Sequence, residues 1–354
     1  MKIFLYIDCM QMGGANRVMA NLSDYFQNTG HDVVLINDIK PVEGIPEYPV
    51  SVKRVFLDQN GETAEFKNLK RITCLRKLVK KERPDVVVSF MGPPNIRMLL
   101  STIGLKTRKI VSVRNDPYQE YGSGIKRIIA KTIFCLADGC VFQTEDAARY
   151  FGNRLQKRSR IIYNPVNPKF YKYKWNKQKN EIAVVGRLQS QKNPLLAVNA
   201  FALIADRYLD YTLVFYGDNE LKDRIKERAN ELGISDRVRI HGKSSTIENH
   251  LEESALYLLS SDYEGMPNAL MEAMAVGIPV ISTDCPCGGP RTLIQNDKQG
   301  VLVPVKDEVA MSEAMDRVLS DENLQKNMSI EERKRAKDFT PDNIFKQWED
   351  FLKA

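Results

Sequence analysis

The sequence predicts an α/β protein built from two doubly wound domains. Its 354 residues suit two domains at roughly 100–200 residues each. Apolar, β-branched runs of strand length alternate with helix-length segments in the first half, and the same alternation restarts near residue 180. Near-continuous apolar strands are typical of parallel sheets covered on both faces. We therefore expect two Rossmann-like domains, facing one another, with ligands bound at the carboxyl ends of their strands.

The first half forms the first predicted domain, residues 1–165. Its strand candidates are residues 2–8, 32–38, 52–57, 85–90, 109–114, 139–144 and 160–164, and its helix candidates are residues 15–29, 67–82, 95–103, 123–137 and 145–152. Parallel strands joined by helices make right-handed crossovers, which gives the doubly wound arrangement.

The second predicted domain covers residues 180–340. Its strand candidates are residues 181–186, 211–216, 237–241, 256–259, 279–283 and 301–303, and its helix candidates are residues 193–207, 219–232, 246–253, 267–276, 307–320 and 322–338. Residues 164–180 contain two Asn-Pro pairs and no clear periodicity, so they are interpreted as a linker.

A last helix is predicted over residues 341–354. Thr340 and Pro341 supply an N-cap and a first helical residue. The helix carries one apolar stripe, which must be buried against another part of the protein. The stripe consists of Ile344, Phe345, Trp348 and Leu352.

Charge and cysteine usage narrow the class of protein. Residues 1–170 hold 27 Lys and Arg against 16 Asp and Glu, a balance of +11; the remaining 25 basic and 29 acidic residues give −4. A basic first half indicates an anionic partner. The six cysteines are scattered, and Cys285 and Cys287 have no companion His or Cys nearby, so neither disulfides nor zinc are expected. The absence of a signal-peptide pattern and of a long apolar run predicts a cytoplasmic protein.

Two glycine-containing turns are candidate ligand sites. Gly13 and Gly14 follow the first strand and precede a helix, where glycine allows close approach of a ligand to the backbone. A plain tight turn explains them equally well. Gly186 and Arg187, with Lys192 downstream, follow the first strand of the second half, and their two cations suit a diphosphate. Taken alone, these cations also fit an ordinary solvated surface.

A third candidate site joins two carboxylates across a helix start. Glu264 and Glu272 lie eight residues apart, with Pro267 placed to open a helix between them. One carboxylate can accept hydrogen bonds from a ribose diol and the other from a sugar hydroxyl. Helix-start N–H groups can reach a phosphate. The alternative is two surface glutamates beside an amphipathic helix.

These strings resemble the retaining glycosyltransferases of the GT-B fold, known as glycosyltransferase family 4. The resemblance rests on EGMPNALMEAMAVGIPVISTD, whose E-x7-E spacing is specific, and on G-R-L-x-x-x-K upstream. It covers nearly the whole chain, and it implies that the helix over residues 341–354 packs back on the first domain.

The resemblance implies a role for each matching residue. Arg187 and Lys192 neutralise the donor diphosphate, Glu272 holds the ribose hydroxyls, and Glu264 contacts the transferred sugar. Further donor-binding positions are Gly13, Gly14, Gly186, Gly217, Asp218, His241, Gly242, Lys243, Gly265, Met266, Pro267, Asn268, Ala269 and Leu270.

Arg114 departs from the family pattern. Many members have His where this chain has Arg114, at the end of the fifth strand. An arginine cannot act as a base, although it can hold a sugar hydroxyl or an acceptor phosphate. We count Arg114 with Arg187, Lys192 and Glu264 as candidate catalytic residues. The acceptor is expected between Arg114 and the turn at Gly13 and Gly14.

The expected activity is retaining transfer of a hexose or N-acetylhexosamine from a nucleotide sugar, preferably a UDP-sugar, to a glycan or polyprenyl-diphosphate-linked glycan. No cofactor or metal is expected, because no D-x-D motif occurs in the cleft-forming loops. The alternatives are a nucleotide-sugar epimerase or phosphorylase on the same architecture and a non-catalytic sugar-binding or partner subunit. Nucleic acid is not an expected partner, because no recognisable binding module is present.

The predicted helix over residues 67–82 carries seven basic side chains around an apolar stripe. Such a helix suits an anionic membrane surface or ligand. A packed helix with a solvated basic face is the alternative. With a lipid-linked acceptor, this helix would place the protein peripherally at the inner face of the cell membrane.

Overall fold

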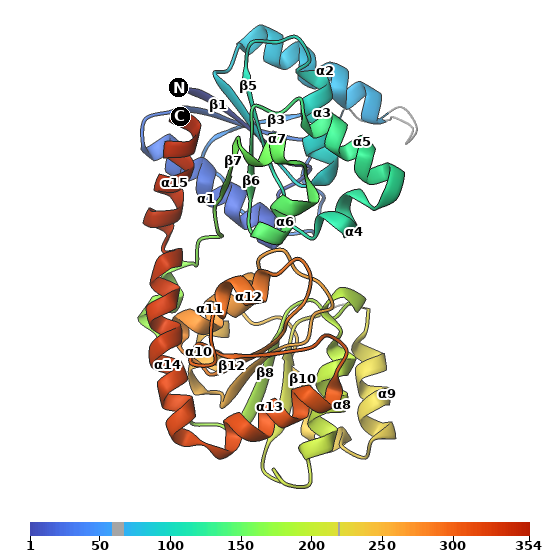
Figure 1. Ribbon diagram of the computed structural model, residues 1–354, viewed down its shortest axis with the longest axis vertical. Helices are drawn as coiled ribbons and strands as arrows, with labels where there is room; N and C mark the ends of the chain where they lie inside the picture. Colours follow the sequence, from blue (N-terminus) through green and yellow to red (C-terminus); the bar gives the residue numbers. More distant parts are fainter. Residues whose placement is uncertain (59–66, 219) are drawn as a thin grey trace. The chain divides into compact units, whose positions relative to one another are not determined.

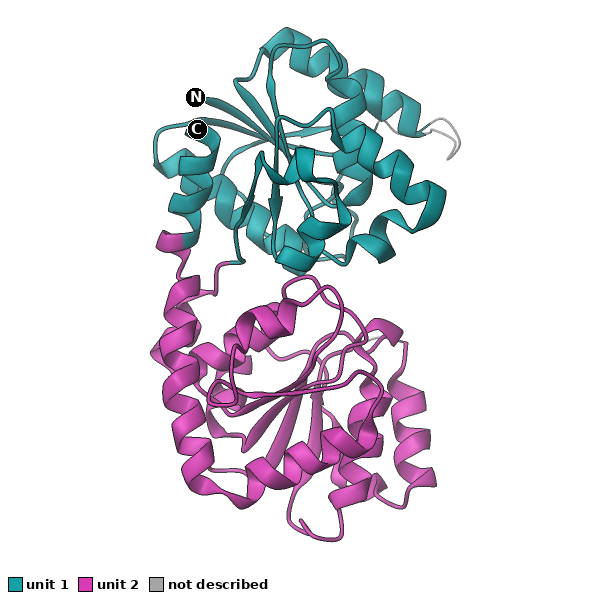
Figure 2. Ribbon diagram, viewed as in Figure 1, with its two compact units in different colours: residues 1–164, 344–354 teal, residues 165–343 magenta. Residues whose placement is uncertain are grey.

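The computed structural model describes residues 1–58, 67–218 and 220–354. The chain divides into two compact units (Figure 2). Unit 1 contains residues 1–164 and 344–354, and unit 2 contains residues 165–343. Each unit is a parallel sheet with helices on both faces, as the alternating sequence pattern predicts.

Unit 1 is built on seven parallel strands in the order β3-β2-β1-β4-β5-β6-β7. The strands are β1 Lys2–Tyr6, β2 Asp32–Asn37, β3 Lys53–Phe56, β4 Val86–Phe90, β5 Arg108–Ser112, β6 Gly139–Phe142 and β7 Ser159–Ile161. The order reverses at β1 and β4, and this switch point is where doubly wound sheets open a crevice for ligands.

Helices cover both faces of the unit 1 sheet (Figure 1). They are α1 Gly14–Asn28, α2 Lys67–Glu82, α3 Gly92–Ser101, α4 Pro117–Tyr121, α5 Gly124–Phe134, α6 Glu145–Tyr150, α7 Asn153–Gln156 and α15 Pro341–Lys353. The apolar stripe of α15 lies in the core of unit 1, where Trp348 packs against Phe90 with 5.6 Å between ring centroids. The end of the chain is therefore part of the first unit's core.

Unit 2 repeats the design with six parallel strands in the order β10-β9-β8-β11-β12-β13. The strands are β8 Glu181–Val185, β9 Thr212–Tyr216, β10 Val238–Ile240, β11 Leu256–Leu259, β12 Val280–Thr283 and β13 Val301–Val303. Its α-helices are α8 Pro194–Ile204, α9 Lys222–Glu231, α10 Ile247–Glu253, α11 Asn268–Val276, α12 Gly289–Leu293, α13 Glu308–Ser320 and α14 Glu322–Ala336. The switch point lies between β8 and β11.

The linker prediction needs correction, because residues 165–180 pack within unit 2. They contain the 3-10 helix η1, Pro168–Lys172, which contacts α11 and buries Phe170. The Trp175 indole Nε1 donates to the Ser254 carbonyl at 2.8 Å. Periodicity missed this segment because its order comes from single anchoring side chains rather than from a regular apolar face.

Smaller differences concern short elements. The helices α4, α7 and α12 have only four or five residues, and the sequence did not predict them, because a single turn gives no periodic signal. Residue 219, the first of the predicted helix 219–232, lies outside the described residues. Among the described residues, none of the helices combines the length and apolar composition that crossing a bilayer requires.

Candidate active site

A cavity of about 260 Å³ opens at the carboxyl ends of the strands on one side of the unit 2 switch point. The loops after β8, β9 and β10 and the start of α10 line it. The lining residues are Val185, Gly186, Arg187, Tyr216, Gly217, Asp218, Lys243, Ser244 and Ile247. Five of the predicted donor-binding or catalytic positions therefore lie together: Gly186, Arg187, Gly217, Asp218 and Lys243.

Two glycines bring the strand ends close together at this cavity. A Cβ built at Gly217 would lie 1.7 Å from the carbonyl oxygen of Gly186, so no side chain fits there. Gly186 itself has a φ of +153°, which side-chain-bearing residues rarely adopt. The sequence thus uses glycine where the backbones of β8 and β9 meet and open the cavity.

The loop after β8 carries the two predicted cations. Arg187 is exposed and contributes to the cavity wall, and Lys192 ends the 3-10 helix η2, Ser190–Lys192. The Ser260 hydroxyl donates to the Lys192 carbonyl at 2.9 Å, and the Asp262 N–H donates to the Gln191 carbonyl at 2.9 Å. These bonds attach the loop after β8 to the loop after β11, which holds Lys192 beside the predicted sugar site.

Glu264 is buried on the loop after β11. Its carboxylate forms an ion pair with Lys192 and accepts a hydrogen bond from the Ser261 hydroxyl at 2.7 Å. Its backbone N–H donates to the Pro286 carbonyl at 2.7 Å, and the Cys287 N–H donates to its carbonyl at 3.1 Å. The loops after β8, β11 and β12 therefore fix Glu264 from three sides.

Glu272 is buried on α11. Its charge and that of Glu264 both influence the buried hydroxyl of Tyr257. Burial and the charges of Glu264 and Glu272 raise the pKa of Tyr257 well above its ordinary value. The tyrosine is fully buried on β11. The two carboxylates of the E-x7-E pattern thus converge on the same region of unit 2.

The loop before α11 packs against the start of α12 in this region. A Cβ at Gly289 would lie 1.9 Å from the Gly265 carbonyl oxygen, so the loop before α11 and the start of α12 are in direct contact. Asn268 is the first residue of α11 and Pro267 its N-cap, one residue later than the sequence predicts. Gly265, Met266 and Leu270 are buried, and Asn268 and Ala269 are half-buried.

At the wall of the cavity, three rings from β9, α10 and the end of β10 pack together. Tyr216 packs on His241 and His250, with centroid distances of 5.0 Å and 4.5 Å. Burial and the neighbouring His241 lower the pKa of His250. No sequence motif indicates this cluster, because His250 is distant along the chain from Tyr216. Gly242 lies beside His241 with a φ of +85°.

The predicted site residues of unit 1 have different surroundings. Gly13 is the N-cap of α1 and Gly14 its first residue, at the carboxyl end of β1. Arg114 is buried, stacks on Phe90 with its Cζ 3.9 Å from the ring centroid, and donates to the Asn164 Oδ1 at 2.8 Å. Burial lowers its pKa to about 9.

These contacts leave the Arg114 guanidinium largely buried in unit 1. Its Cζ also lies 5.5 Å from the Trp348 ring centroid, so the side chain is enclosed by the core that α15 completes. The sequence placed Arg114 correctly at a strand end. It did not indicate that a distant helix would cover it.

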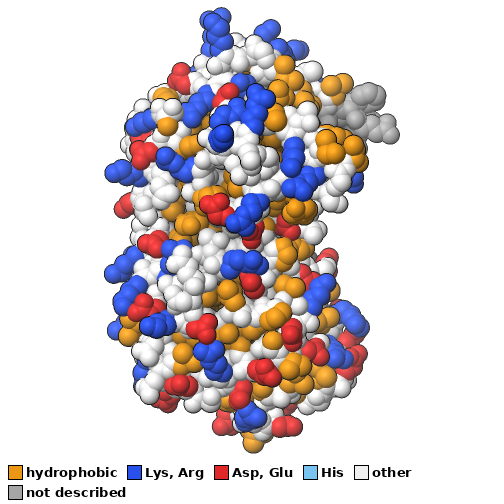
Figure 3. Space-filling view, viewed as in Figure 1, with side chains coloured by type: hydrophobic (Ala, Val, Ile, Leu, Met, Phe, Trp, Pro, Cys, Tyr) orange, Lys and Arg blue, Asp and Glu red, His pale blue; other side chains and the backbone are white. Residues whose placement is uncertain are grey.

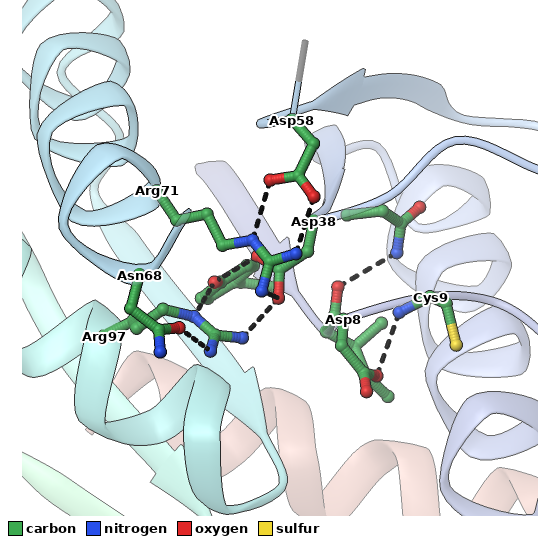
Figure 4. Close-up of polar contacts among 10 residues, drawn as sticks. Asp8, Cys9, Asp38, Asp58, Asn68, Arg71 and Arg97 are labelled. Atoms are coloured by element: carbon green, nitrogen blue, oxygen red, sulfur yellow. Dashed lines mark hydrogen bonds and ion pairs between the residues drawn. The ribbon is translucent and has the colours of Figure 1, made fainter. Parts of the chain in front are cut away.

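A polar network that the sequence did not indicate lies at the ends of β1, β2 and β3 (Figure 4). Buried Asp38 accepts from the Tyr6 hydroxyl at 2.7 Å and pairs with Arg97. Arg71 of α2 holds Asp58 by two hydrogen bonds of 2.7 and 2.6 Å. Burial raises the pKa of Asp38, whereas the hydrogen bond from Arg71 lowers that of Asp58.

Two family models match the chain. The model described as Glycosyltransferase Family 4 matches residues 12–170, and the model described as Glycosyl transferases group 1 matches residues 167–335. The chain belongs to glycosyltransferase family 4. It is therefore a glycosyltransferase of the GT-B fold, and the cavity of unit 2 lies in the part matched by the group 1 model.

Individual relatives agree with the family. The chain is 29% identical, over 98% of its length and 97% of the relative's, to the Campylobacter jejuni GalNAc-α-(1→4)-GalNAc-α-(1→3)-diNAcBac-PP-undecaprenol α-1,4-N-acetyl-D-galactosaminyltransferase. An Escherichia coli UDP-Gal:α-D-GlcNAc-diphosphoundecaprenol α-1,3-galactosyltransferase is 33% identical over 40% of this chain and 37% of its own. The solved structure of sucrose-phosphate synthase from Thermosynechococcus elongatus shares the fold, with a TM-score of 0.85 at 18% identity, covering 99% of this chain and 98% of that one.

Proposed function

We propose that this glycosyltransferase transfers a hexose or N-acetylhexosamine, with retention, from a UDP-sugar to a polyprenyl-diphosphate-linked glycan in bacterial glycan synthesis. The observation that carries the proposal is that Arg187 and Lys192 line the same hollow at the end of β8 and that Lys192 pairs with Glu264, with Glu272 buried on the helix that follows. Cations suit the diphosphate, and carboxylates suit the hydroxyls of ribose and sugar. The names of the Campylobacter and Escherichia relatives support the lipid-linked acceptor, and the latter supports UDP.

Each part of the donor has a matching part of the site. The cavity between Tyr216 and Lys243 would take the nucleobase, and the cations of the loop after β8 would take the diphosphate. Glu272 would accept hydrogen bonds from the ribose hydroxyls. Glu264, already fixed by Ser261 and by two backbone bonds, would contact the transferred sugar.

The chemistry assigned to these residues is front-face transfer without a metal. The bond between the sugar C1 and the diphosphate oxygen breaks, and the acceptor oxygen bonds to C1 from the same face. The acceptor hydroxyl proton passes to the departing phosphate oxygen. Arg187 and Lys192 stabilise the negative charge that develops on that diphosphate, which is the step where fixed cations accelerate a reaction most.

The acceptor's lipid anchor would bring the enzyme to the cytoplasmic face of a membrane. The helix α2 contributes basic side chains toward such a surface, and each Lys or Arg near an anionic bilayer adds about 1 kcal/mol of attraction. The glycosyltransferase would therefore act as a peripheral protein.

Nucleotide binding tests the donor assignment. UDP, GDP, ADP and their common sugar conjugates would be compared by thermal shift, with and without EDTA. A ligand at 100 times its Kd stabilises the native state by about 2.7 kcal/mol, a shift large enough to detect. We expect stabilisation by UDP and UDP-sugars that EDTA does not remove. Stabilisation by GDP or ADP alone would overturn the UDP assignment.

Transfer to a defined acceptor tests the activity. The enzyme would be incubated with each stabilising UDP-sugar and a synthetic polyprenyl-diphosphate-linked glycan, and the product's anomeric configuration read by NMR. Retention of the donor configuration is expected. Binding of UDP-sugars without transfer to any lipid-linked or free glycan would favour the non-catalytic sugar-binding alternative.

A further inference from the structure

The helix α5 of unit 1 exposes an apolar ridge. Ile125, Ile128 and Ile129 are 69%, 60% and 53% exposed, and they lie on one face because residues three and four apart are neighbours on a helix. Isolated exposed apolar residues are ordinary, but an exposed helix face is normally polar. The three isoleucines, which we call the α5 ridge, therefore point to an interaction surface.

The α5 ridge is not needed to hold α5 in place. The opposite face of the helix anchors it: Ala130 and Phe134 are buried, and the Phe134 ring stacks on Phe151 at 4.5 Å. Arg127 donates from Nη2 to the Tyr150 carbonyl at 2.9 Å. Substituting the isoleucines by polar residues should therefore leave unit 1 folded.

The charged residues of α5 and of the nearby helices α3 and α2 are basic, apart from one glutamate at the end of α2. The sequence of α5 contains Lys126, Arg127 and Lys131 and no acidic residue. The helix α3 lies between α5 and α2 and contacts both (Figure 1), and the only acidic residue of α2 is Glu82, at its end. On α2, Leu69 is also 63% exposed. Figure 3 shows basic and hydrophobic side chains intermixed on unit 1.

We infer that the α5 ridge inserts into the headgroup region of an anionic lipid bilayer, with the surrounding lysines contacting lipid phosphates. An apolar face rimmed by Lys and Arg is the pattern of helices that lie in a membrane interface. A second copy of the chain fits less well, because a two-fold contact would bring two identical basic faces together. The inference rests on the proposed function, in which the acceptor is embedded in a membrane.

Vesicle sedimentation tests the insertion directly. The full chain would be mixed with phosphatidylcholine vesicles that contain or lack phosphatidylglycerol. The test variant is Ile125→Gln/Ile128→Gln/Ile129→Gln. The matched control is Leu203→Gln/Leu209→Gln/Val309→Gln, which changes three apolar residues of unit 2 with comparable exposure. We expect the test variant to bind anionic vesicles about tenfold more weakly or worse, because it loses three inserting side chains. The control should bind like the wild type.

Several outcomes would overturn the inference. Unchanged vesicle binding of the test variant would show that attraction is electrostatic alone, and no binding by the wild type would exclude the bilayer. A concentration-dependent dimer that the test variant abolishes would assign the α5 ridge to a second copy. The vesicles contain neither acceptor nor nucleotide, so failure of transfer with intact vesicle binding would count against the proposed function alone. Equal thermal midpoints would confirm that all three proteins are folded.

Discussion

Lys192 and Glu264 form an ion pair that joins the loop after β8 to the loop after β11. The Glu264 carboxylate is nearly inaccessible to solvent, whereas Lys192 is partly exposed. The cation assigned to the diphosphate is thus held, before any donor binds, by the carboxylate assigned to the sugar. Such an arrangement sets both groups in position in advance, and it makes each depend on the other.

The substitution Lys192→Met should lower both the affinity for the donor and the stability of unit 2. Loss of a charge-assisted contact to the diphosphate should lower UDP affinity about 10- to 100-fold. Leaving the Glu264 carboxylate without its cation should cost roughly 1–3 kcal/mol of stability. Calorimetric titration with UDP and urea unfolding would measure the two effects. Lys222→Met, which removes an exposed partner of Asp218, is the control and should change UDP affinity little.

Separate substitutions of the two carboxylates should have different effects. Glu272→Ala should raise the Kd for UDP about tenfold or more, because the ribose hydroxyls lose their acceptor. Glu264→Ala should lower kcat about 100-fold while changing UDP affinity less, because the sugar is absent from UDP. Titration with UDP and steady-state kinetics would distinguish them. An unaltered UDP affinity in Glu272→Ala would refute the ribose assignment.

The contact between Gly217 and Gly186 gives a steric prediction. A methyl group at residue 217 would lie 1.7 Å from the Gly186 carbonyl oxygen, so the strand ends of β8 and β9 must separate. Gly217→Ala should cost about 1–3 kcal/mol and abolish measurable UDP binding by distorting the cavity. Gly152→Ala is the matched control, because a Cβ there has no neighbour within 4 Å. Equal UDP affinity in both variants would place the nucleotide elsewhere.

The sequence indicated the fold well where the pattern is long and regular. Among the described residues, each strand and each helix of nine or more residues overlaps a predicted segment, because buried parallel strands and amphipathic helices have strong periodic signals. The order of the segment around Phe170 and Trp175 was not predicted, because two side chains anchor an irregular stretch to α11 and its neighbours. Sequence patterns report regular faces, and they miss order that comes from a few distant contacts.

For the site, the sequence identified residues that lie in short motifs. Arg187, Lys192 and Glu264 are positions that local strings mark and that the fold brings together. The stacking of Tyr216 on His250 and the covering of Arg114 by Trp348 involve residues far apart in the chain. No local sequence motif predicts contacts between such distant residues. Their prediction requires knowing which strands are neighbours and where the last helix packs.

A buried carboxyl in α14 makes the stability of the enzyme depend on pH. Glu332 is fully buried; its Oε1 accepts from the Val280 N–H at 3.1 Å, and its Oε2 has no hydrogen-bond partner among the described residues. Burial raises its pKa well above the ordinary value of 4.5. The stability contributed by the protonated carboxyl is complete below pH 4.5 and is lost as pH rises toward the folded-state pKa.

Replacing this carboxyl by an amide should therefore stabilise the protein at neutral and alkaline pH but not in acid. Glu332→Gln keeps an acceptor for Val280 and cannot ionise, so it should be more stable than wild type by about 1–3 kcal/mol at pH 8. Near pH 4.5 the two proteins should unfold alike. Urea unfolding across this pH range would measure the difference. The neighbouring Glu331→Gln, a more exposed carboxylate paired with Lys334, should show no such pH dependence. A stability difference that is constant with pH would mean that Glu332 does not titrate as its burial requires.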